Sequence, residues 1–344
     1  MALHFRGAVL PDGEVRDLWL LGDRVTFERP AQESTTVVDG GYLLPGLVDV
    51  HTHPGTGEDG FTLDRFAAEC GDHVAAGVTA VRFPGLGGAV PDDVRDLPEL
   101  PRMVRAGRWL AWSGLSRHAD FHTIVDDLPA AAVEQARAHD GWCKIMGDWD
   151  LESDPVPYAT MAAVVAAVHE AGGRVAAHCQ TEAGSLNAAL AGVDSIEHGM
   201  AMPETAVSLL AANASAYVPT LTVFAASAER VRLRGTDRSR LWLRGYETII
   251  ERVREAHDAG VRVLAGTDSA PFGNVATEVS HLISAGLPAT TAIGAASWTA
   301  RAWLGLPGLE EGGLADLVAY QEDPRVNPSV LHHPHRIVLR GRLL

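Results

Sequence analysis

Residues 45–53 read PGLVDVHTH, an apolar run that ends in two histidines. Side chains two positions apart in a strand point to the same side of the sheet, so the imidazoles of His51 and His53 can face one point. Neutral imidazole is a common ligand of zinc, iron and nickel. The HxH pattern alone also fits a pair of surface histidines, but the apolar run before it argues against an exposed loop. We therefore interpret this stretch as a buried strand that ends at a metal site.

Short apolar runs of the same kind recur along the middle of the chain, and amphipathic stretches separate most of them. Residues 61–77 and 157–173 are two such stretches, and the second ends in Gly-Gly, a helix stop signal. Strands that alternate with helices predict βα units and a parallel sheet. Eight units close into a (β/α)₈ TIM barrel, whose active site lies at the C-terminal ends of the strands. We expect the strands at LVDVH (47–51), TAVRF (79–83), WLAWS (109–113), WCKI (142–145), RVAAH (174–178), VDSIEH (193–198), AYVPT (216–220) and RVLAGT (262–267).

The two ends of the chain have a different pattern. Residues 1–45 and 313–344 hold short strand-like pieces separated by Gly, Asp and Pro, and neither end has a long helical pattern. We expect both termini to form one small β-sandwich and residues 46–312 to form the barrel of this α/β protein. The 344 residues are enough for a barrel and one small extra element.

Composition and charge narrow the classes of function. The chain is 47% hydrophobic and 21% charged, as in ordinary globular proteins, and its formal net charge of −16 disfavours nucleic-acid binding. Cys70, Cys143 and Cys179 do not make a disulfide framework, which favours a reducing cytosol. We find no signal peptide and no apolar run of the ~20 residues that a membrane-spanning helix needs. We expect a cytoplasmic protein with a small-molecule substrate and without a nucleic-acid or membrane partner, and homo-oligomerisation stays open.

Three more polar residues occupy the ends of predicted strands. His178 closes RVAAH, His198 closes VDSIEH, and Asp268 follows RVLAGT. One such histidine is usually a core or capping residue, but two of them after an HxH pair are expected to converge with it at the strand ends. A carboxylate beside them can be a metal ligand and a proton acceptor, whereas the alternative is that Asp268 caps the next helix.

Lys144 lies in the apolar segment GWCKIMG. A charged lysine beside a divalent cation is unfavourable in a low dielectric. Burial can make the amine neutral, or CO₂ can add to it and form a carbamate that bridges two metals. The remaining alternative is a lysine on the other face of the strand that reaches toward a helix.

The longest insertion, at about residues 221–260, is rich in arginine. It forms either a solvated helical face or a lid or clamp for an anionic part of the substrate, and charge runs of this kind favour the solvated face. Its arginines are Arg230, Arg232, Arg234, Arg238, Arg240 and Arg244.

Taken in order, these segments resemble the amidohydrolase superfamily, and within it the imidazolonepropionase-like and prolidase-like metal-dependent hydrolases. The resemblance covers nearly the whole chain. It rests on PGLVDVHTH, GVTAVRFPGLGG (77–88), VHEAGGRVAAHCQT, AGVDSIEHGM, YVPTLTV (217–223), LAGTDSA (264–270), ASWTARAWLGLPG, GGLADLVAYQEDP and RIVLRGRLL.

The resemblance implies a site with two divalent metal ions, zinc or else manganese, iron or cobalt. His51, His53 and Asp268 would hold the more buried metal, and His178 and His198 the more exposed one. Lys144 would be the carboxylated bridge of this binuclear metal centre. Metal-bound hydroxide would attack the substrate carbonyl, and Asp268 would pass the proton to the leaving nitrogen.

The segment SGLSRHADFH (113–122) stands where relatives often carry Gly-Gly-His-Gly. It makes His118 and His122 candidates for substrate binding, whereas a loop histidine without a ligand is the alternative.

We expect a metal-dependent amidohydrolase that cleaves an amide-like C–N bond in a cyclic amide, an N-acyl amino acid or a dipeptide-like substrate. One alternative is a mononuclear deaminase of a nitrogen heterocycle, which would not use Lys144 as a bridge. The other is a catalytically inactive relative that acts as a binding protein. The sequence leaves the substrate and the direction of the reaction, hydrolysis or ring closure, undecided.

Overall fold

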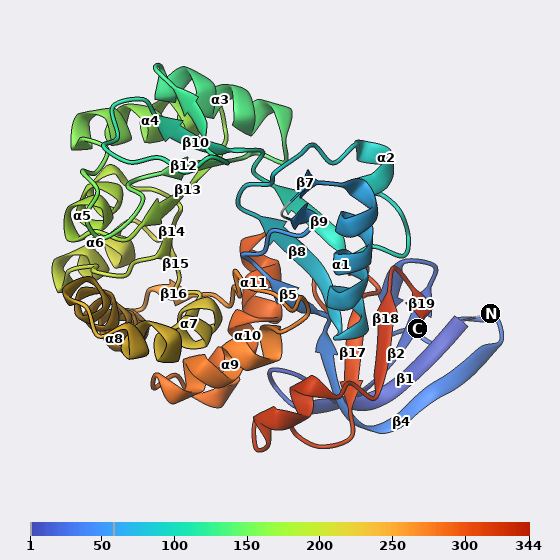
Figure 1. Cartoon of the computed structure of the whole chain (residues 1–344). Coiled ribbons are helices and arrows are strands. Elements are labelled where there is room, and N and C mark those ends of the chain that lie inside the picture. Colours follow the sequence, from blue (N-terminus) through green and yellow to red (C-terminus); the bar gives the residue numbers. More distant parts are fainter. Residues whose placement is uncertain (1, 58) are drawn as a thin grey trace.

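The computed structural model describes residues 2–57 and 59–344, and Figure 1 shows an α/β arrangement with parallel strands. These strands form two sheets, in the orders β5-β8-β9 and β11-β10-β12-β13-β14-β15-β16, and neighbouring strands in both are parallel. The bounds are β5 Leu47–Asp49, β8 Val78–Phe83, β9 Arg102–Arg105, β10 Trp109–Trp112, β11 Thr123–Val125, β12 Trp142–Met146, β13 Arg174–Cys179, β14 Ser195–His198, β15 Ala216–Val218 and β16 Arg262–Val263. The predicted parallel α/β fold is therefore confirmed, and each of the eight predicted strands overlaps one of these.

Helices follow most of the parallel strands, and in Figure 1 α3 to α6 and α8 lie along the outer side of the larger parallel sheet. The two predicted helical stretches contain α1 and α4. Thr62, just before α1, accepts a hydrogen bond from the backbone N–H of Arg65, which satisfies one free donor at the start of that helix. The bounds are α1 Leu63–Ala75, α2 Asp92–Arg95, α3 Leu128–Ala138, α4 Tyr158–Glu170, α5 Glu182–Ala191, α6 Glu204–Ala212, α7 Leu221–Arg234, α8 Asp237–Asp258, α9 Val275–Ser284, α10 Ala289–Ala295, α11 Trp298–Trp303 and the 3₁₀ turn Pro328–His332.

Two links connect the parallel sheets. β9 runs into β10 after only residues 106–108. On the other side, the backbone N–H of Val50, just after β5, donates to the carbonyl of Ala265, two residues after β16, at 3.0 Å. One buried apolar cluster contains residues from β5, β8, β9, β12, β13 and β15 together with α11. One face of both parallel sheets therefore packs into a shared core.

The two ends of the chain meet in one seven-stranded sheet of the order β19-β18-β17-β4-β1-β2-β3. β17 pairs with β4 antiparallel, and this pairing joins the C-terminal strands to the N-terminal ones. The bounds are β1 Ala2–Val9, β2 Glu14–Leu21, β3 Arg24–Thr26, β4 Ser34–Pro45, β17 Leu317–Tyr320, β18 Arg336–Leu339 and β19 Arg342–Leu343, and β6 Thr56–Gly57 and β7 Gly60–Phe61 form a separate pair. The termini thus share a sheet, and the predicted sandwich stays a prediction.

The carboxylate of Asp316, just before β17, links the seven-stranded sheet of the two chain ends to β9 and α11 by hydrogen bonds. It accepts hydrogen bonds from Arg102 of β9 at 2.5 Å, from Arg301 of α11 at 2.9 Å and from the backbone N–H of Arg340 at 2.7 Å. Both Asp316 and Arg301 are buried. Burial acts to raise the pKa of Asp316, but Arg301 and Arg102 outweigh burial and lower it.

Replacing Asp316 with asparagine is expected to lower the free energy of unfolding at pH 7 by about 3–5 kcal/mol, because it leaves buried Arg301 without its counter-ion. A carboxylate with a lowered pKa stabilises the fold above its ordinary pKa of 3.8 and loses this effect as the pH falls below it. Urea unfolding of both proteins from pH 7 to pH 3 tests this. A difference that does not shrink at low pH would contradict the ionic explanation, and Asp323→Asn, at a partly exposed Arg325 pair, is the control.

Among the described residues, no helix combines the length and apolar character required to span a bilayer.

Candidate metal centre

A cavity of about 210 Å³ opens at the C-terminal ends of the parallel strands. It brings together every residue that the sequence predicted as a metal ligand. These are His51, His53, Lys144, His178, His198 and Asp268. The remaining lining residues are Trp109, Phe121, Met146, Trp149, Gln180, Val223 and Phe224.

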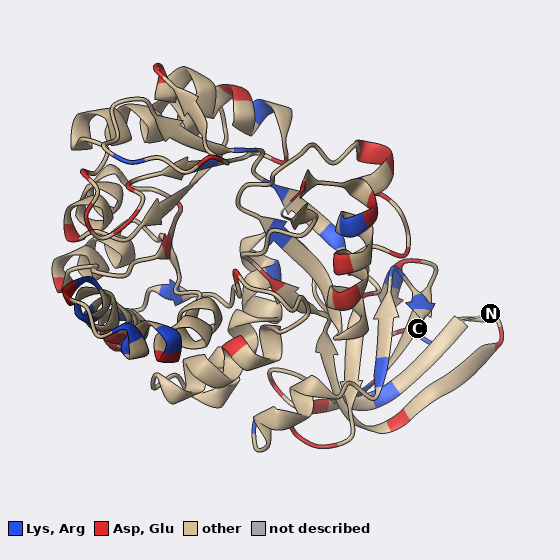
Figure 2. Ribbon diagram, in the orientation of Figure 1, with Lys and Arg blue, Asp and Glu red and all other residues tan. Residues whose placement is uncertain are grey.

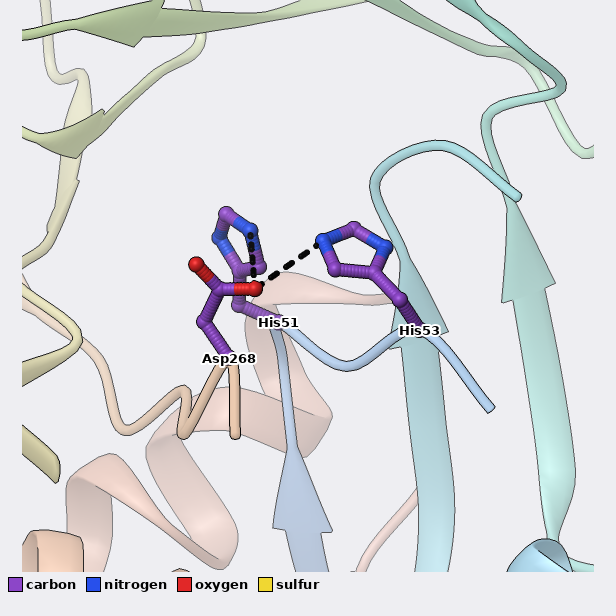
Figure 3. Close-up of side chains that lie close together, drawn as sticks. All are labelled: His51, His53 and Asp268. Carbon is purple, nitrogen blue, oxygen red and sulfur yellow. Dashed lines mark ion pairs between the residues drawn. The ribbon is translucent and has the colours of Figure 1, made fainter. Parts of the chain in front are cut away.

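Three of the six candidate ligands form a tight group at the base of this cavity. The ligand atoms of His51, His53 and Asp268 lie within 4.8 Å of one another. Figure 3 shows Asp268 turned toward both imidazoles, with one of its oxygens 3.8 Å from His51 Nε2 and 3.3 Å from His53 Nε2. These are the residues that the resemblance implied for the more buried metal.

Hydrogen bonds behind the two imidazoles determine which nitrogen faces the group. His51 donates through Nδ1 to Glu197 at 2.6 Å, and His53 donates through Nδ1 to the carbonyl of Gly85 at 2.7 Å. In a neutral ring with its proton on Nδ1, Nε2, the nitrogen nearer Asp268, is the atom that can bind a metal. Such partners orient metal-binding histidines and raise their basicity.

The strands end earlier than the sequence predicted, so strand alternation alone does not align His51 with His53. Both lie beyond β5, which ends at Asp49. The buried carboxylate of Asp49 accepts hydrogen bonds from the backbone N–H of His51 at 3.0 Å and from the N–H and hydroxyl of Thr267 at 3.1 and 2.6 Å. Asp49 thereby holds the segments that carry His51 and Asp268 side by side.

A buried ion pair stands behind His51. Arg82 of β8 donates to both carboxylate oxygens of Glu197 at 2.8 and 2.9 Å, and both side chains are fully buried. The Arg82 guanidinium also lies over the rings of Trp142 and Trp303, 5.0 and 4.9 Å from their centroids. Burial acts to raise the pKa of Glu197, but Arg82 and His51 outweigh it and hold it well below the ordinary value. Glu197 is therefore an ionised acceptor for the His51 N–H.

His178 and His198 complete the ring of histidines. Their ring centroids are 4.6 Å apart, and the ring of His198 lies 5.0 Å from that of His51. His178 Nε2 donates to the carbonyl of Trp149 at 3.0 Å, and His198 Nδ1 lies 2.8 Å from the hydroxyl of Thr220. Burial lowers the pKa of His51 to about 4 and that of His178 to about 3. The imidazoles of His51 and His178 are therefore neutral near pH 7, the state that binds metal.

Backbone strain is concentrated around this ring. His198, Thr220 and Asp268 have φ angles of 70°, 50° and 49°, in the left-handed region that non-glycine residues seldom adopt. Such residues cost about 1–3 kcal/mol each and cluster at functional sites.

Burial acts to raise the pKa of Asp268, but His51 and His53 outweigh burial and bring it to about 2.

Lys144 points into the cavity and not toward a helix. It lies two residues after Trp142 on β12, and Trp142 belongs to the core shared by the two parallel sheets, so both side chains are on the same face. The side chain is 1% exposed, and its Nζ has no hydrogen-bond partner among the described residues. Burial lowers the pKa of Lys144 to about 8. The alternative of an outward-facing lysine is therefore wrong.

The two loop histidines lie beside the cavity but do not line it. His118 and His122 are in contact, with ring centroids 6.2 Å apart, and His122 packs on Phe121 and Trp149. It is Phe121, between them in sequence, that lines the cavity. A substrate-binding role for either histidine stays a prediction.

The residues that the sequence reasoning missed are charged groups inside apolar strand runs. Asp49, Arg82 and Glu197 interrupt LVDVH, TAVRF and VDSIEH, and each is fully buried. Asp148, after β12, accepts from the N–H of Gln180 at 2.7 Å and from the N–H of Thr181 at 2.9 Å. A charge within a buried run needs a partner, and this was the available signal.

The arginine-rich insertion forms α7 and α8 and their connection. All six of its arginines are exposed, and Figure 2 shows basic and acidic residues interspersed on α8. None of the six lines the cavity with the histidines. Arg238 donates to Asp150 at 3.0 Å. The arrangement supports the solvated helical face.

Comparison with known proteins identifies the family. The model of the amidohydrolase family matches residues 42–335. The chain belongs to the amidohydrolase family. An uncharacterized protein of Mycobacterium tuberculosis (strain ATCC 25618 / H37Rv) is 40% identical over 366 residues, which cover 99% of this chain and 95% of the relative. The predicted membership of the amidohydrolase superfamily is confirmed, and it supports a metal-dependent hydrolase.

Solved structures share the fold over nearly the whole chain. A Xaa-Pro dipeptidase with bound methionine in its active site has a TM-score of 0.83 at 24% identity, over 100% of both chains. The ochratoxinase of A. niger has a TM-score of 0.83 at 20% identity, over 99% of this chain and 95% of that chain. At these identities the likeness concerns the fold. Together with the family it makes this amidohydrolase a prolidase-like hydrolase in architecture.

Proposed function

We propose that this amidohydrolase holds two divalent metal ions bridged by a carbamate on Lys144 and hydrolyses an amide-like C–N bond. His51, His53 and Asp268 would bind one metal, and His178 and His198 the other. Zinc is the ion we propose, because neutral imidazole and carboxylate are ligands that it accepts. A cytosolic location is proposed with it, since the cysteines are free and buried.

The observation that carries this proposal is the isolated amine of Lys144. A buried polar atom without a hydrogen bond is costly, and Lys144 Nζ is one. Lys144 is also the single lysine in the sequence, in which every other strongly basic residue is an arginine. An arginine cannot form a carbamate. The presence of the single lysine at this buried position therefore supports a role that requires an amine.

The donor set fits the metals in charge as well as in type. A lysine cation would add to the positive charge of two divalent ions, whereas a carbamate and the Asp268 carboxylate offset it. When bound, the metals would supply Lewis acidity and a nucleophile from water. Asp268 lies at the cavity floor beside both His51 and His53, where its carboxylate can take a proton and return it to the leaving nitrogen.

We further propose that the parallel strands close into a (β/α)₈ barrel over residues 46–312, with 1–45 and 313–344 as a separate small β-sandwich. The two links between the parallel sheets and their shared core support closure. The position of all six candidate ligands beyond or near the C-terminal ends of strands agrees with the usual site of a barrel.

Metal content and carbamate formation test the function together. Protein purified without chelator is expected to hold about two metals per chain by elemental mass spectrometry, and the value is expected to fall in Lys144→Ala and Lys144→Arg. Lys144→Glu, which restores a carboxylate, should recover part of it. Because the chain has one lysine, ¹³C-labelled bicarbonate should give one lysine carbamate signal by NMR, absent in Lys144→Arg. Equal metal content in all variants would rule out the bridge.

A second candidate is a mononuclear deaminase of a nitrogen heterocycle. It is favoured by one observation: among the described residues, His51, His53 and Asp268 are the one group of three or more metal-binding side chains with ligand atoms within 4.8 Å. One metal per chain, unchanged in Lys144→Ala, would support it. Failure to bind any metal would instead favour an inactive binding protein.

A further inference from the structure

We call the surface formed by the six candidate metal ligands the floor of the cavity, and the other lining residues its walls. The walls differ in chemistry from the floor. Apart from the six candidate ligands, six of the lining residues are aromatic or aliphatic and one, Gln180, is a neutral amide. The backbone N–H of Gln180 donates to Asp148, but its side-chain amide makes no hydrogen bond with the described residues and is free for a ligand. Above the floor, the described lining therefore offers apolar surface together with uncharged hydrogen-bonding groups, the side-chain amide of Gln180 and the indole N–H groups of Trp109 and Trp149.

The aromatic wall is continuous beside two of the histidines. Phe121 lies with its ring centroid 5.1 Å from Trp109 and 5.4 Å from Trp149. Trp109 contacts His53 at 5.2 Å, and Trp149 stacks on His178 at 5.4 Å. Phe121 lines the cavity and is 45% exposed, so part of its ring is open to contact with a ligand.

Phe224 of α7 contributes a second apolar surface beside His198, with ring centroids 5.8 Å apart. The whole cavity of about 210 Å³ is larger than an apolar cavity of about 150 Å³ that accepts benzene. The site therefore has room for an aromatic ring next to a group that reacts at the floor.

Arg117, in the loop after β10, and Arg238, in the first turn of α8, do not supply a cation to this space. Arg117 and Arg238 both donate to the same oxygen of Asp150, at 3.2 and 3.0 Å, and neither lines the cavity. A free carboxylate held between the aromatic walls would lose its hydration without gaining a charged partner.

We infer that the substrates are uncharged amides that carry an aromatic ring next to the scissile bond. A free carboxylate on this ring lowers both the affinity and the kcat/KM of the substrate. This inference rests on the proposed hydrolase function. The ring would pack on Phe121, Trp149 and Phe224, and Gln180 would hydrogen-bond to the amide. In the reaction, the C–N bond breaks and one water is consumed: the acyl carbon takes its hydroxyl and becomes a carboxylic acid, and the leaving nitrogen takes its other hydrogen and becomes an amine.

Acetanilide and 4-acetamidobenzoate test the inference, because they share the scissile bond and the ring and differ by one carboxylate. Metal-loaded protein is expected to cleave acetanilide with a kcat/KM about 100-fold higher. Calorimetric titration of the metal-free protein, which cannot turn over, should show the same order of affinities. Phe121→Ala should weaken acetanilide binding by about 5- to 10-fold, whereas Tyr158→Ala, at a 50% exposed aromatic residue outside the cavity, should leave it unchanged.

The outcomes separate this inference from the hydrolase proposal. Cleavage that favours 4-acetamidobenzoate, especially if Arg238→Ala abolishes the preference, would overturn the substrate class and leave the hydrolase intact. Selective binding of acetanilide without cleavage of any amide would support the pocket chemistry and overturn the hydrolase. Failure of metal-free protein to prefer acetanilide, or no effect of Phe121→Ala, would overturn the inference.

Discussion

Asp268→Asn is expected to lower kcat by about 10³-fold or more, because asparagine keeps the size of the side chain but cannot take up a proton. Asp268 lies 3.8 and 3.3 Å from the Nε2 atoms of His51 and His53, and its ionised state is held by them. Steady-state kinetics on metal-loaded protein measures the loss, with an amide that the unaltered enzyme cleaves.

Metal content must be determined on the same samples, because Asp268 is also a candidate ligand. If Asp268→Asn retains metal and loses activity, the proton-transfer role is supported. If added metal restores full activity, Asp268 is only a ligand and the role is wrong. Asp154→Asn, at an exposed position, is the matched control and should behave as the unaltered protein.

Arg82→Met is expected to lower the free energy of unfolding by about 3–5 kcal/mol, because it leaves the buried carboxylate of Glu197 without its counter-ion. The guanidinium donates twice to Glu197 and once to Ser195, and it is fully buried. Urea unfolding by circular dichroism measures the change. The double variant Arg82→Met/Glu197→Gln should be more stable than Arg82→Met alone, since it removes the unpaired charge.

Glu197→Gln alone is expected to lower the affinity of the site for metal. Loss of the carboxylate that accepts the His51 N–H should weaken metal binding by about 10- to 100-fold, as for other groups that orient histidine ligands. Competition with a chromophoric chelator measures this in folded protein. An unchanged affinity would show that Glu197 supports the fold and not the orientation of His51. Arg301 is buried, bonds to Asp316 and Thr79 and does not line the cavity, so Arg301→Met is the control and should destabilise the fold without this loss.

Local pattern was sufficient for the approximate positions of eight parallel strands and for most of the candidate site, but it missed β9 and β11. An apolar run that ends in histidine, as in RVAAH and VDSIEH, reports both a buried strand and a polar residue at its end, and the structure brings these ends into one cavity. Parallel strands place their C-terminal ends at one edge. The convergence of His178 and His198 with the HxH pair thus followed from topology that the alternation of strands and helices already indicated.

The tertiary structure alone decided what surrounds those residues. Which face of β12 carries Lys144, and that its amine is buried without a partner, depends on the packing of strands distant in sequence. Glu197, which accepts the His51 N–H, is 146 residues from His51 in the sequence, and Arg82, which pairs with Glu197, is 115 residues from it. The aromatic walls likewise come from β10, two separate loops and α7. A pattern along the chain records which residues are buried, but partners that meet only through long-range packing leave no periodic signal.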